Sequence, residues 1–226
     1  MTAVRRLLRL AGRIGAGIVG VVLALIVIYR WAGPPVTPLM LLRLPEAGTI
    51  RRDPVTLDEI AAALPRSVVA SEDNRFCLHH GIDWDAVAEA IDDYEEEGRL
   101  RGASTITMQV ARNLFLWPGG GFLRKAVEAP IALAIDLLWP KRRIIEVYLN
   151  IAEWGEGIYG AEAAAQVYFR KPARALSGRE AALMAAVLPN PRRWSPASPS
   201  RYIAGRAGVI QGRIGQLGPL LGCIAG

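Results

Sequence analysis

The chain has 226 residues, of which 52% are hydrophobic, and carries a formal net charge of +6. This length supports one sizeable core together with a membrane segment and argues against two full domains. The basic balance indicates an anionic partner, such as a nucleic acid, phospholipid head groups or a phosphorylated substrate. Cys77 and Cys223 fit no zinc-ligand spacing, and they can either pair outside the cytoplasm or stay free.

The N-terminal region predicts a membrane anchor. Residues 1–13 carry four arginines and no acid, and residues 14–29 contain no charge. With residues 30–33 added, the run is long enough to cross a bilayer as a helix whose arginine-rich end stays cytoplasmic. A cleavable signal peptide is the main alternative, although W-A-G-P-P at residues 31–35 is a poor cleavage site. A soluble core helix is a third, but such a helix rarely lacks a polar face over this length.

The rest of the chain predicts a mainly α fold. Residues 34–53 contain prolines and no clear period, so we expect a linker there. Beyond them, apolar periodicity predicts helices nearly to the end, and no alternating run is strong enough to indicate a sheet. The predicted helices cover residues 56–63, 84–97, 105–116, 122 to about 130, 141–150, 158–169, 177–188 and 198–217.

Local signals place several ends of these helices. Thr56 with Glu59, and Ser177 with Glu180, read as capping boxes that open two helices. Asp83 is a candidate N-cap for the helix at 84–97, which Gly98 stops. Because proline removes a helix hydrogen bond, Pro130 is expected to kink or end the helix that begins near residue 122.

The first candidate site is S-E-D-N-R-F-C-L-H-H-G-I-D at residues 71–83. Glu72 and Asp73 follow the apolar run at 68–70, so at least one of them should lie at the edge of a core. Partial burial raises the pKa of a carboxylate and makes it a better base. The alternative is that both acids end a helix on a solvated face, and this stretch alone does not decide between the two.

Two further stretches suggest phosphate chemistry. Residues 102–113, G-A-S-T-I-T-M-Q-V-A-R-N, place hydroxyls and backbone N–H groups at the start of a helix, where they can hold phosphate oxygens or simply cap the helix. Arg124, Lys125 and Glu128 share one helix face. They form either an exposed ion pair or a site for a pyrophosphate, which would bind the two cations directly or bind through a divalent ion held by Glu128.

The order of these stretches, together with K-R-R-I-I-E-V-Y-L-N at 141–150 and I-Y-G-A-E-A-A-A-Q-V-Y-F at 158–169, resembles the peptidoglycan glycosyltransferase family. The likeness is greatest to its monofunctional biosynthetic members and covers roughly residues 55–195. The pattern E-D-x-x-F-x-x-H-x-G is matched by Glu72, Asp73, Phe76, His79 and Gly81. The pattern G-x-S-T-I-T-x-Q is matched by Gly102, Ser104, Thr105, Ile106, Thr107 and Gln109, and R-K-x-x-E by Arg124, Lys125 and Glu128.

The chain departs from the family's usual pattern at three places. Met108 stands where a second glutamine is usual, and Arg112 where a lysine is usual. A further arginine, common before R-K-x-x-E, is absent from residues 119–121. Arg112 keeps the charge, whereas the other two departures remove polar contacts to donor sugar and pyrophosphate. They bear on substrate affinity more than on the type of reaction.

The resemblance implies a single N-terminal transmembrane helix followed by a lysozyme-like helical domain, with a small membrane-proximal lobe at roughly residues 102–140. The expected divisions are a cytoplasmic tail, an anchor, a linker, a glycosyltransferase domain and a C-terminal tail. In order, they cover residues 1–13, 14–33, 34–53, 54–217 and 218–226.

The family's chemistry implies that lipid II is polymerised into glycan strands with release of undecaprenyl pyrophosphate. Glu72 and Glu128 are the implied catalytic residues, with Glu72 as the general base. His79 is expected to support the motif by hydrogen bonding. The implied substrate-binding residues are Asp73, which would also orient the motif, Ser104, Thr105, Gln109, Arg112, Arg124 and Lys125. A magnesium or manganese ion near Glu128 is the implied metal, without an organic cofactor.

The implied location is the cell inner membrane, with the N-terminus cytoplasmic and the catalytic domain periplasmic. The implied partners are lipid II, the growing lipid-linked strand, the membrane and proteins of cell division or cell-wall synthesis. A glycan-cleaving muramidase or lytic transglycosylase remains an alternative, as does an inactive membrane-tethered scaffold. A nucleic-acid binder fits poorly, because the anchor puts the charge outside the cytoplasm and no module of that kind is present.

Overall fold

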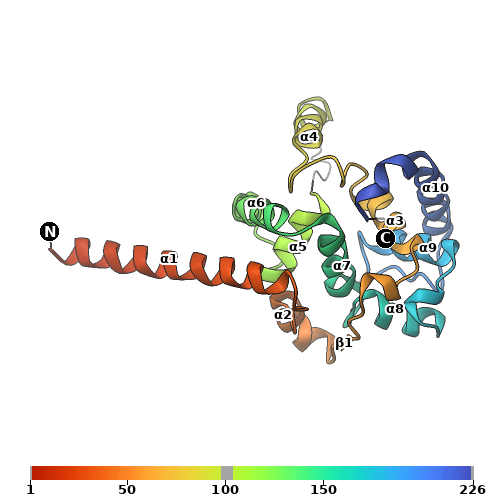
Figure 1. The fold of residues 1–226 in the computed structure, drawn as a ribbon, viewed down its shortest axis with the longest axis horizontal. Coiled ribbons are helices and arrows are strands. Elements are labelled where there is room, and N and C mark those ends of the chain that lie inside the picture. Colours follow the sequence, from red (N-terminus) through yellow and green to blue (C-terminus); the bar gives the residue numbers. More distant parts are fainter. Residues whose placement is uncertain (1, 98–103, 225–226) are drawn as a thin grey trace.

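The computed structural model describes residues 2–97 and 104–224. Its first element, α1 (Thr2–Tyr29), projects away from the compact body of the protein (Figure 1). Residues Val4–Tyr29 of this helix include an 18-residue stretch with a mean hydropathy of 2.3, and they are long and apolar enough to cross a membrane. The predicted apolar helix is therefore confirmed, although the helix begins well before residue 14 and includes the basic segment.

The base of α1 is joined to the body by specific contacts. Ile26 is fully buried, and its carbonyl oxygen accepts a 2.8 Å hydrogen bond from the indole N–H of Trp139. Arg143 donates to the carbonyl oxygen of Tyr29 at 2.8 Å. A removable signal peptide would not need such contacts, so they favour a retained anchor.

Residues 34–53, in which no regular structure was predicted, contain a helix, α2 (Pro38–Ala47), and a short strand, β1 (Arg51–Arg52). Thr37 caps α2 by accepting a hydrogen bond from the backbone N–H of Met40, and Pro38 begins the helix, a position where proline is favoured. Gly48 ends it in a left-handed conformation. Pro38 was therefore a helix-start signal, and Pro45 lies within the same helix.

One group of helices forms the half of the body farther from α1 (Figure 1). Here α3 (Ala63–Glu72) packs against α9 (Gly178–Val187) and α10 (Arg201–Leu217). Before α3, the capping box of Thr56 and Glu59 forms, but it opens only the 3₁₀ helix η1 (Leu57–Glu59), not a helix to residue 63. The capping box of Ser177 and Glu180 opens α9 as predicted.

A second group lies next to the base of α1. It contains α5 (Ile106–Phe115), α6 (Gly121–Leu138) and α7 (Lys141–Ile151). The helix containing Pro130 does not end there, because Pro130 and Ala126 both lie on its exposed side. Water can therefore satisfy the Ala126 carbonyl group that proline leaves without a donor. The other expected helices in this region are confirmed within a residue or two.

A small sheet lies between the groups and was not predicted. Its strand order is β1-β3-β2, with β2 (Glu153–Gly155) antiparallel and β1 parallel to β3 (Ile158–Tyr159). Strands this short contain no alternating pattern that a sequence could reveal. Because β3 occupies residues 158–159, the helix expected from residue 158 begins later, as α8 (Ala161–Phe169).

The remaining elements complete the body. α4 (Trp84–Glu97) is capped as predicted, since Asp83 accepts a 3.1 Å hydrogen bond from the backbone N–H of Ala86. The expected stop at Gly98 lies outside the described residues. Two 3₁₀ helices are η2 (Ala173–Ala175) and η3 (Gly218–Ile224). Cys77 and Cys223 form a disulfide that ties the segment after α3 to η3.

Candidate functional site

The two adjacent acids at the end of α3 have different surroundings. Glu72 is partly buried, and its Oε2 accepts a 3.2 Å hydrogen bond from the side-chain amide of Gln109 on α5. Burial raises the pKa of Glu72, and the Gln109 hydrogen bond and the charges of Arg206 and Arg112 only partly oppose the rise. Such a carboxylate is suited to accept a proton.

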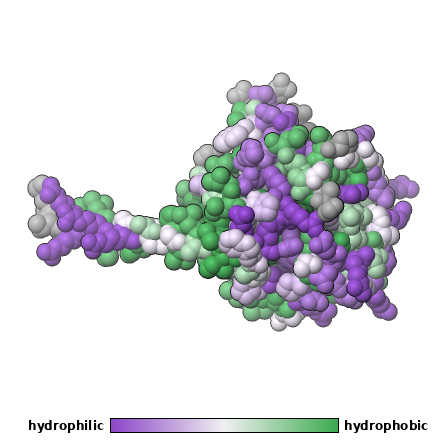
Figure 2. All heavy atoms as spheres, in the orientation of Figure 1, coloured by the Kyte–Doolittle hydropathy of each residue, from purple (hydrophilic) through white to green (hydrophobic). Residues whose placement is uncertain are grey.

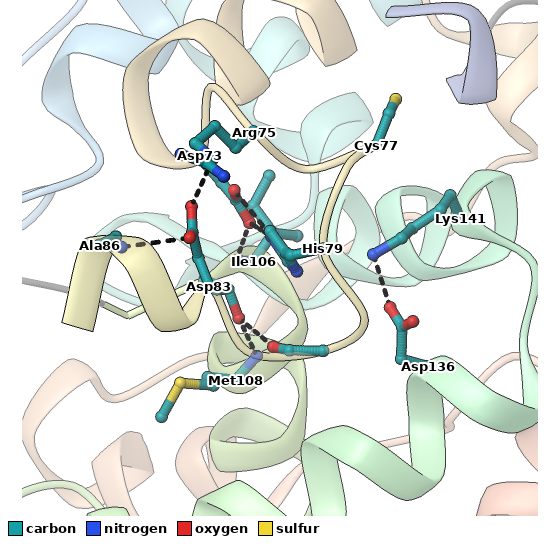
Figure 3. A network of polar contacts seen from close by, with 12 residues as sticks. Asp73, Arg75, Cys77, His79, Asp83, Ala86, Ile106, Met108, Asp136 and Lys141 are labelled. Atoms are coloured by element: carbon teal, nitrogen blue, oxygen red, sulfur yellow. Dashed lines mark hydrogen bonds and ion pairs between the residues drawn. The ribbon is translucent and has the colours of Figure 1, made fainter. Parts of the chain in front are cut away.

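Asp73, by contrast, is a buried junction between α3 and α5 (Figure 3). Both of its carboxylate oxygens lie 3.0 Å from Nε2 of His79, and Oδ2 also accepts a 2.9 Å hydrogen bond from the backbone N–H of Ile106. This N–H belongs to the first turn of α5, where a negative charge is favourable. The geometry gives Asp73 and His79 a structural role.

Gly81 closes the same loop against α6. It adopts a left-handed conformation (φ +79°), and a Cβ atom there would lie 2.9 Å from the carbonyl oxygen of Ala132. The hydroxyl of Thr105 donates to the Gly81 carbonyl at 2.6 Å and accepts from the backbone N–H of Met108 at 3.1 Å. Thr105 is therefore a buried N-cap of α5, which is the helix-capping alternative given in the sequence analysis. The preceding residue, Ser104, is partly buried.

Electrostatic contacts hold the outside of this loop, as Figure 3 also shows. Nε of Arg75 lies 3.3 Å from the carboxylate of Asp83. Nζ of Lys141 lies 2.6 Å from Asp136 and 4.7 Å from the centre of the Phe76 ring. Together with the Cys77 disulfide, these contacts fix the chain that follows Glu72.

A pocket of about 280 Å³ lies beside Gln109 and contains the expected cations Arg112 and Arg124. The phenol of Tyr148 donates a 3.1 Å hydrogen bond to Oε1 of Gln109, whose amide nitrogen in turn donates to Glu72. Burial raises the pKa of Tyr148, so its phenol remains a hydrogen-bond donor at neutral pH. Burial also lowers the pKa of Arg112. The pocket is thus connected to Glu72 by a chain of hydrogen bonds.

The R-K-x-x-E helix face is divided by the structure. Arg124 lines the pocket, and its guanidinium group pairs with the buried carboxylate of Glu128 and donates to the carbonyl oxygen of Gly119. Glu128 does not line the pocket, nor does the partly buried Lys125. Glu128 is therefore placed to orient Arg124.

The metal expected at Glu128 finds little support in the surrounding side chains. Within residues 2–97 and 104–224, no three His, Cys, Asp or Glu side chains are grouped closely enough to hold an ion. Glu128 supplies one carboxylate, and Arg124 already neutralises it. This donor set does not fit a protein-held metal site.

Among the residues that line the pocket, Tyr148 and Arg43 were not identified as site residues from the sequence. Tyr148 lies in the helix predicted over residues 141–150, and Arg43 lay in the presumed linker. Arg43 lines the pocket from α2 and pairs with Glu153. It adds a cation to the site whose loop at residues 119–121 lacks the family's arginine. Met108, by contrast, is buried in the apolar core and does not line the pocket.

Comparison with known proteins agrees with this geometry. The transglycosylase family matches residues 41–214. A biosynthetic peptidoglycan transglycosylase of Rhodospirillum centenum is 57% identical over 215 residues, which cover 95% of this chain and 93% of that protein. The enzyme of the same name from Pseudomonas syringae pv. syringae is 48% identical, covering 95% of this chain and 92% of its own length. That from Rhodopseudomonas palustris (strain TIE-1) is 53% identical, covering 77% and 75%. The chain belongs to the transglycosylase family.

Proposed function

We propose that the chain is a peptidoglycan glycosyltransferase, which polymerises lipid II into glycan strands for the bacterial cell wall. One observation carries the proposal: a partly buried glutamate is hydrogen-bonded, through Gln109, to a pocket that contains Arg112 and Arg124. Such a site combines a base with an anion-binding surface, and this combination suits displacement of a pyrophosphate by a sugar hydroxyl.

The reaction begins when the 4-hydroxyl of an incoming lipid II sugar gives its proton to Glu72. The hydroxyl oxygen bonds to the anomeric carbon of the growing strand, and the bond from that carbon to undecaprenyl pyrophosphate breaks, with inversion. A positioned base of this kind contributes about 10²–10⁴-fold to the rate.

The charge that develops on the departing pyrophosphate is the second requirement. Arg112 and Arg124 line the pocket, and the orientation of Arg124 is fixed by Glu128 and by the Gly119 carbonyl group. Arg43 adds a third cation to the wall. Preorganised charges in a water-poor site stabilise such a transition state strongly, because they need no reorganisation during the reaction. Lys125 does not line this pocket, so it would contact substrate only outside it. No step of the proposed reaction requires a metal.

The membrane is the proposed location. Leucines are exposed on α2 and α6, and Figure 2 shows an apolar region between the anchor and the body. These side chains include Leu41, Leu42, Leu123 and Leu137. The site would then lie near the membrane surface, where a lipid-linked substrate is concentrated.

The proposed orientation places the arginine-rich N-terminus in the cytoplasm and the catalytic domain in the periplasm. The disulfide between Cys77 and Cys223 supports this orientation, because disulfides persist in oxidising compartments. Interaction with division or wall-synthesis proteins remains a prediction.

Two substrates test the proposed function. The purified full chain in detergent is expected to release undecaprenyl pyrophosphate from lipid II and to leave purified glycan strands intact. Cleavage of the strands without polymerisation would instead assign a muramidase or lytic transglycosylase. Binding of glycan without any turnover would assign a scaffold. The cationic pocket argues against cleavage, because hydrolysis of a neutral leaving group requires no such charge.

A further inference from the structure

A second cavity, of about 410 Å³, lies on the other side of Glu72. Ser71 forms one wall, and the outer face of α10 forms the rest. The α10 residues that line it are Arg201, Tyr202, Gly205, Arg206, Val209 and Arg213, with the buried Ile210 beneath them. We refer to this cavity as the α10 groove.

The groove is directly connected to the catalytic glutamate. Nη2 of Arg206 donates a 3.1 Å hydrogen bond to the hydroxyl of Ser71, which lies 3.3 Å from Oε1 of Glu72. Glu72 therefore has the Arg112 and Arg124 pocket on one side and the α10 groove on the other. Glu72 lines neither cavity itself but is hydrogen-bonded to one wall residue of each, Gln109 of the pocket and Ser71 of the groove.

The charges of the groove are available for a ligand. None of the ion pairs formed by the described residues includes Arg201, Arg206 or Arg213. Nε of Arg206 is buried without a hydrogen-bond partner. Guanidinium groups bind carboxylates through paired hydrogen bonds, so this face suits a ligand with several carboxylates.

An aromatic surface accompanies these charges. The Tyr202 ring is 62% exposed, and its centre lies 5.7 Å from the ring of Trp194. The apolar face of a sugar ring can pack on such a ring while its hydroxyls remain hydrated. Arg201 and Arg213 are separated by about 18 Å along the helix, which is long enough to contact more than one sugar unit.

The position of α10 indicates whether the groove faces the lipid or the glycan strand of the substrate. α10 lies on the side of the body opposite α1 (Figure 1). The lipid tails must stay near the anchor, whereas the growing strand must leave toward the opposite side. This arrangement favours the strand over a lipid head group as the ligand of the groove.

We propose that the α10 groove binds the growing glycan strand by pairing its arginines with the carboxylates of the muramyl peptide stems. The inference rests on the proposed function and adds to it the part of the substrate that is recognised. No bond is made or broken in the groove, which only holds the strand while Glu72 acts at its end.

The test compares two forms of lipid II, one with free stem carboxylates and one with every stem carboxylate amidated. The measured quantity is the polymerisation rate on the free-carboxylate substrate divided by the rate on the amidated substrate. Because each exposed ion pair contributes little, Arg201→Gln combined with Arg213→Gln is expected to lower the ratio about fivefold. The strands made from the free-carboxylate form should also become shorter.

Two further variants make the result specific. Arg179→Gln removes an exposed charge outside the groove, on α9, and is expected to leave the ratio at the wild-type value. Gly205→Leu fills the groove without removing charge, since a Cβ atom at Gly205 meets no neighbour within 4 Å. It is expected to lower the ratio as the double variant does.

The outcomes separate the two proposals. Turnover of lipid II with a ratio that neither groove variant changes would overturn the groove and leave the proposed function intact. A lower rate on both substrates at constant ratio would assign the arginines to the lipid surface and overturn stem recognition. If the wild-type chain releases no undecaprenyl pyrophosphate, the proposed function fails, and the inference fails with it.

Discussion

Glu72 and Asp73 are neighbours in the sequence, yet they belong to two regions with opposite designs. The Asp73 junction, formed by Asp73, His79, Gly81 and Thr105, is buried, and both Asp73 oxygens are hydrogen-bonded. The pocket beside Glu72 contains Arg43, Arg112 and Arg124, of which Arg43 is paired with Glu153 and Arg124 with Glu128. The junction therefore maintains a shape, whereas the pocket holds a group of oriented cations on one side of the base.

The two regions also depend on each other. The Asp73 carboxylate holds the first turn of α5, and α5 carries both Gln109 and Arg112. The junction therefore sets the distance between the base and the cations. Substitutions in the pocket should remove activity while the fold remains, and substitutions in the junction should primarily reduce stability.

The largest effect is expected for Glu72→Gln. Glutamine keeps the shape but cannot take the proton, so the rate of lipid II polymerisation should fall by about 10²–10⁴-fold. Helicity, measured by circular dichroism, should not change. A variant that polymerises at close to the wild-type rate would show that another group is the base.

Next in size is Arg112→Gln, which removes one charge from the pocket. The loss of one preorganised group should lower kcat by about 10²–10³-fold. Arg112→Lys is the matched control, because it keeps the charge and supplies the residue usual in the family. Equal activity of both variants would show that the charge at this position does not stabilise the leaving pyrophosphate.

Asp73→Asn tests the junction. Asparagine has one acceptor oxygen in place of two and no negative charge, so its hydrogen bonds with the Ile106 N–H and His79 should be weaker, and unfolding in denaturant should become easier by about 3 kcal/mol. Asp92→Asn, on the exposed surface of α4, is the control and should change stability little. Unchanged stability of Asp73→Asn with lost activity would instead place Asp73 in the chemistry.

The smallest effect is expected for Gly81→Ala. A Cβ atom there meets the Ala132 carbonyl oxygen at 2.9 Å and the backbone is left-handed, so stability should fall by about 2 kcal/mol. Gly48→Ala has similar backbone strain but no close neighbour, and about 1 kcal/mol is expected there. Equal losses in thermal unfolding would show that the contact with α6 is not important.

The sequence identifies some residues of both regions and misses others, for physical reasons. Motif residues such as Asp73, His79 and Thr105 interact within two short stretches, so local patterns indicate them. Arg43 and Tyr148 reach the pocket from elements far apart in the chain, and only tertiary packing brings them together. The helices were predictable from caps and periodicity. The sheet was missed because β1 pairs with β3 across more than a hundred residues, in strands too short to show a pattern.

The most direct test of Glu72 as the base is the pH dependence of the single-turnover rate. Only the carboxylate accepts a proton, so activity is lost as pH falls through the pKa of Glu72. Since burial raises this pKa, the loss should begin above the ordinary glutamate value of about 4.3.

Arg206→Gln makes this measurement specific to Glu72. The charge of Arg206 lowers the pKa of Glu72, so its removal should move the acid limb of the profile to still higher pH. Arg179→Gln should leave the limb where it is in the wild type. An acid limb at the ordinary glutamate value, or one that Arg206→Gln does not move, would contradict the assignment of Glu72 as the base.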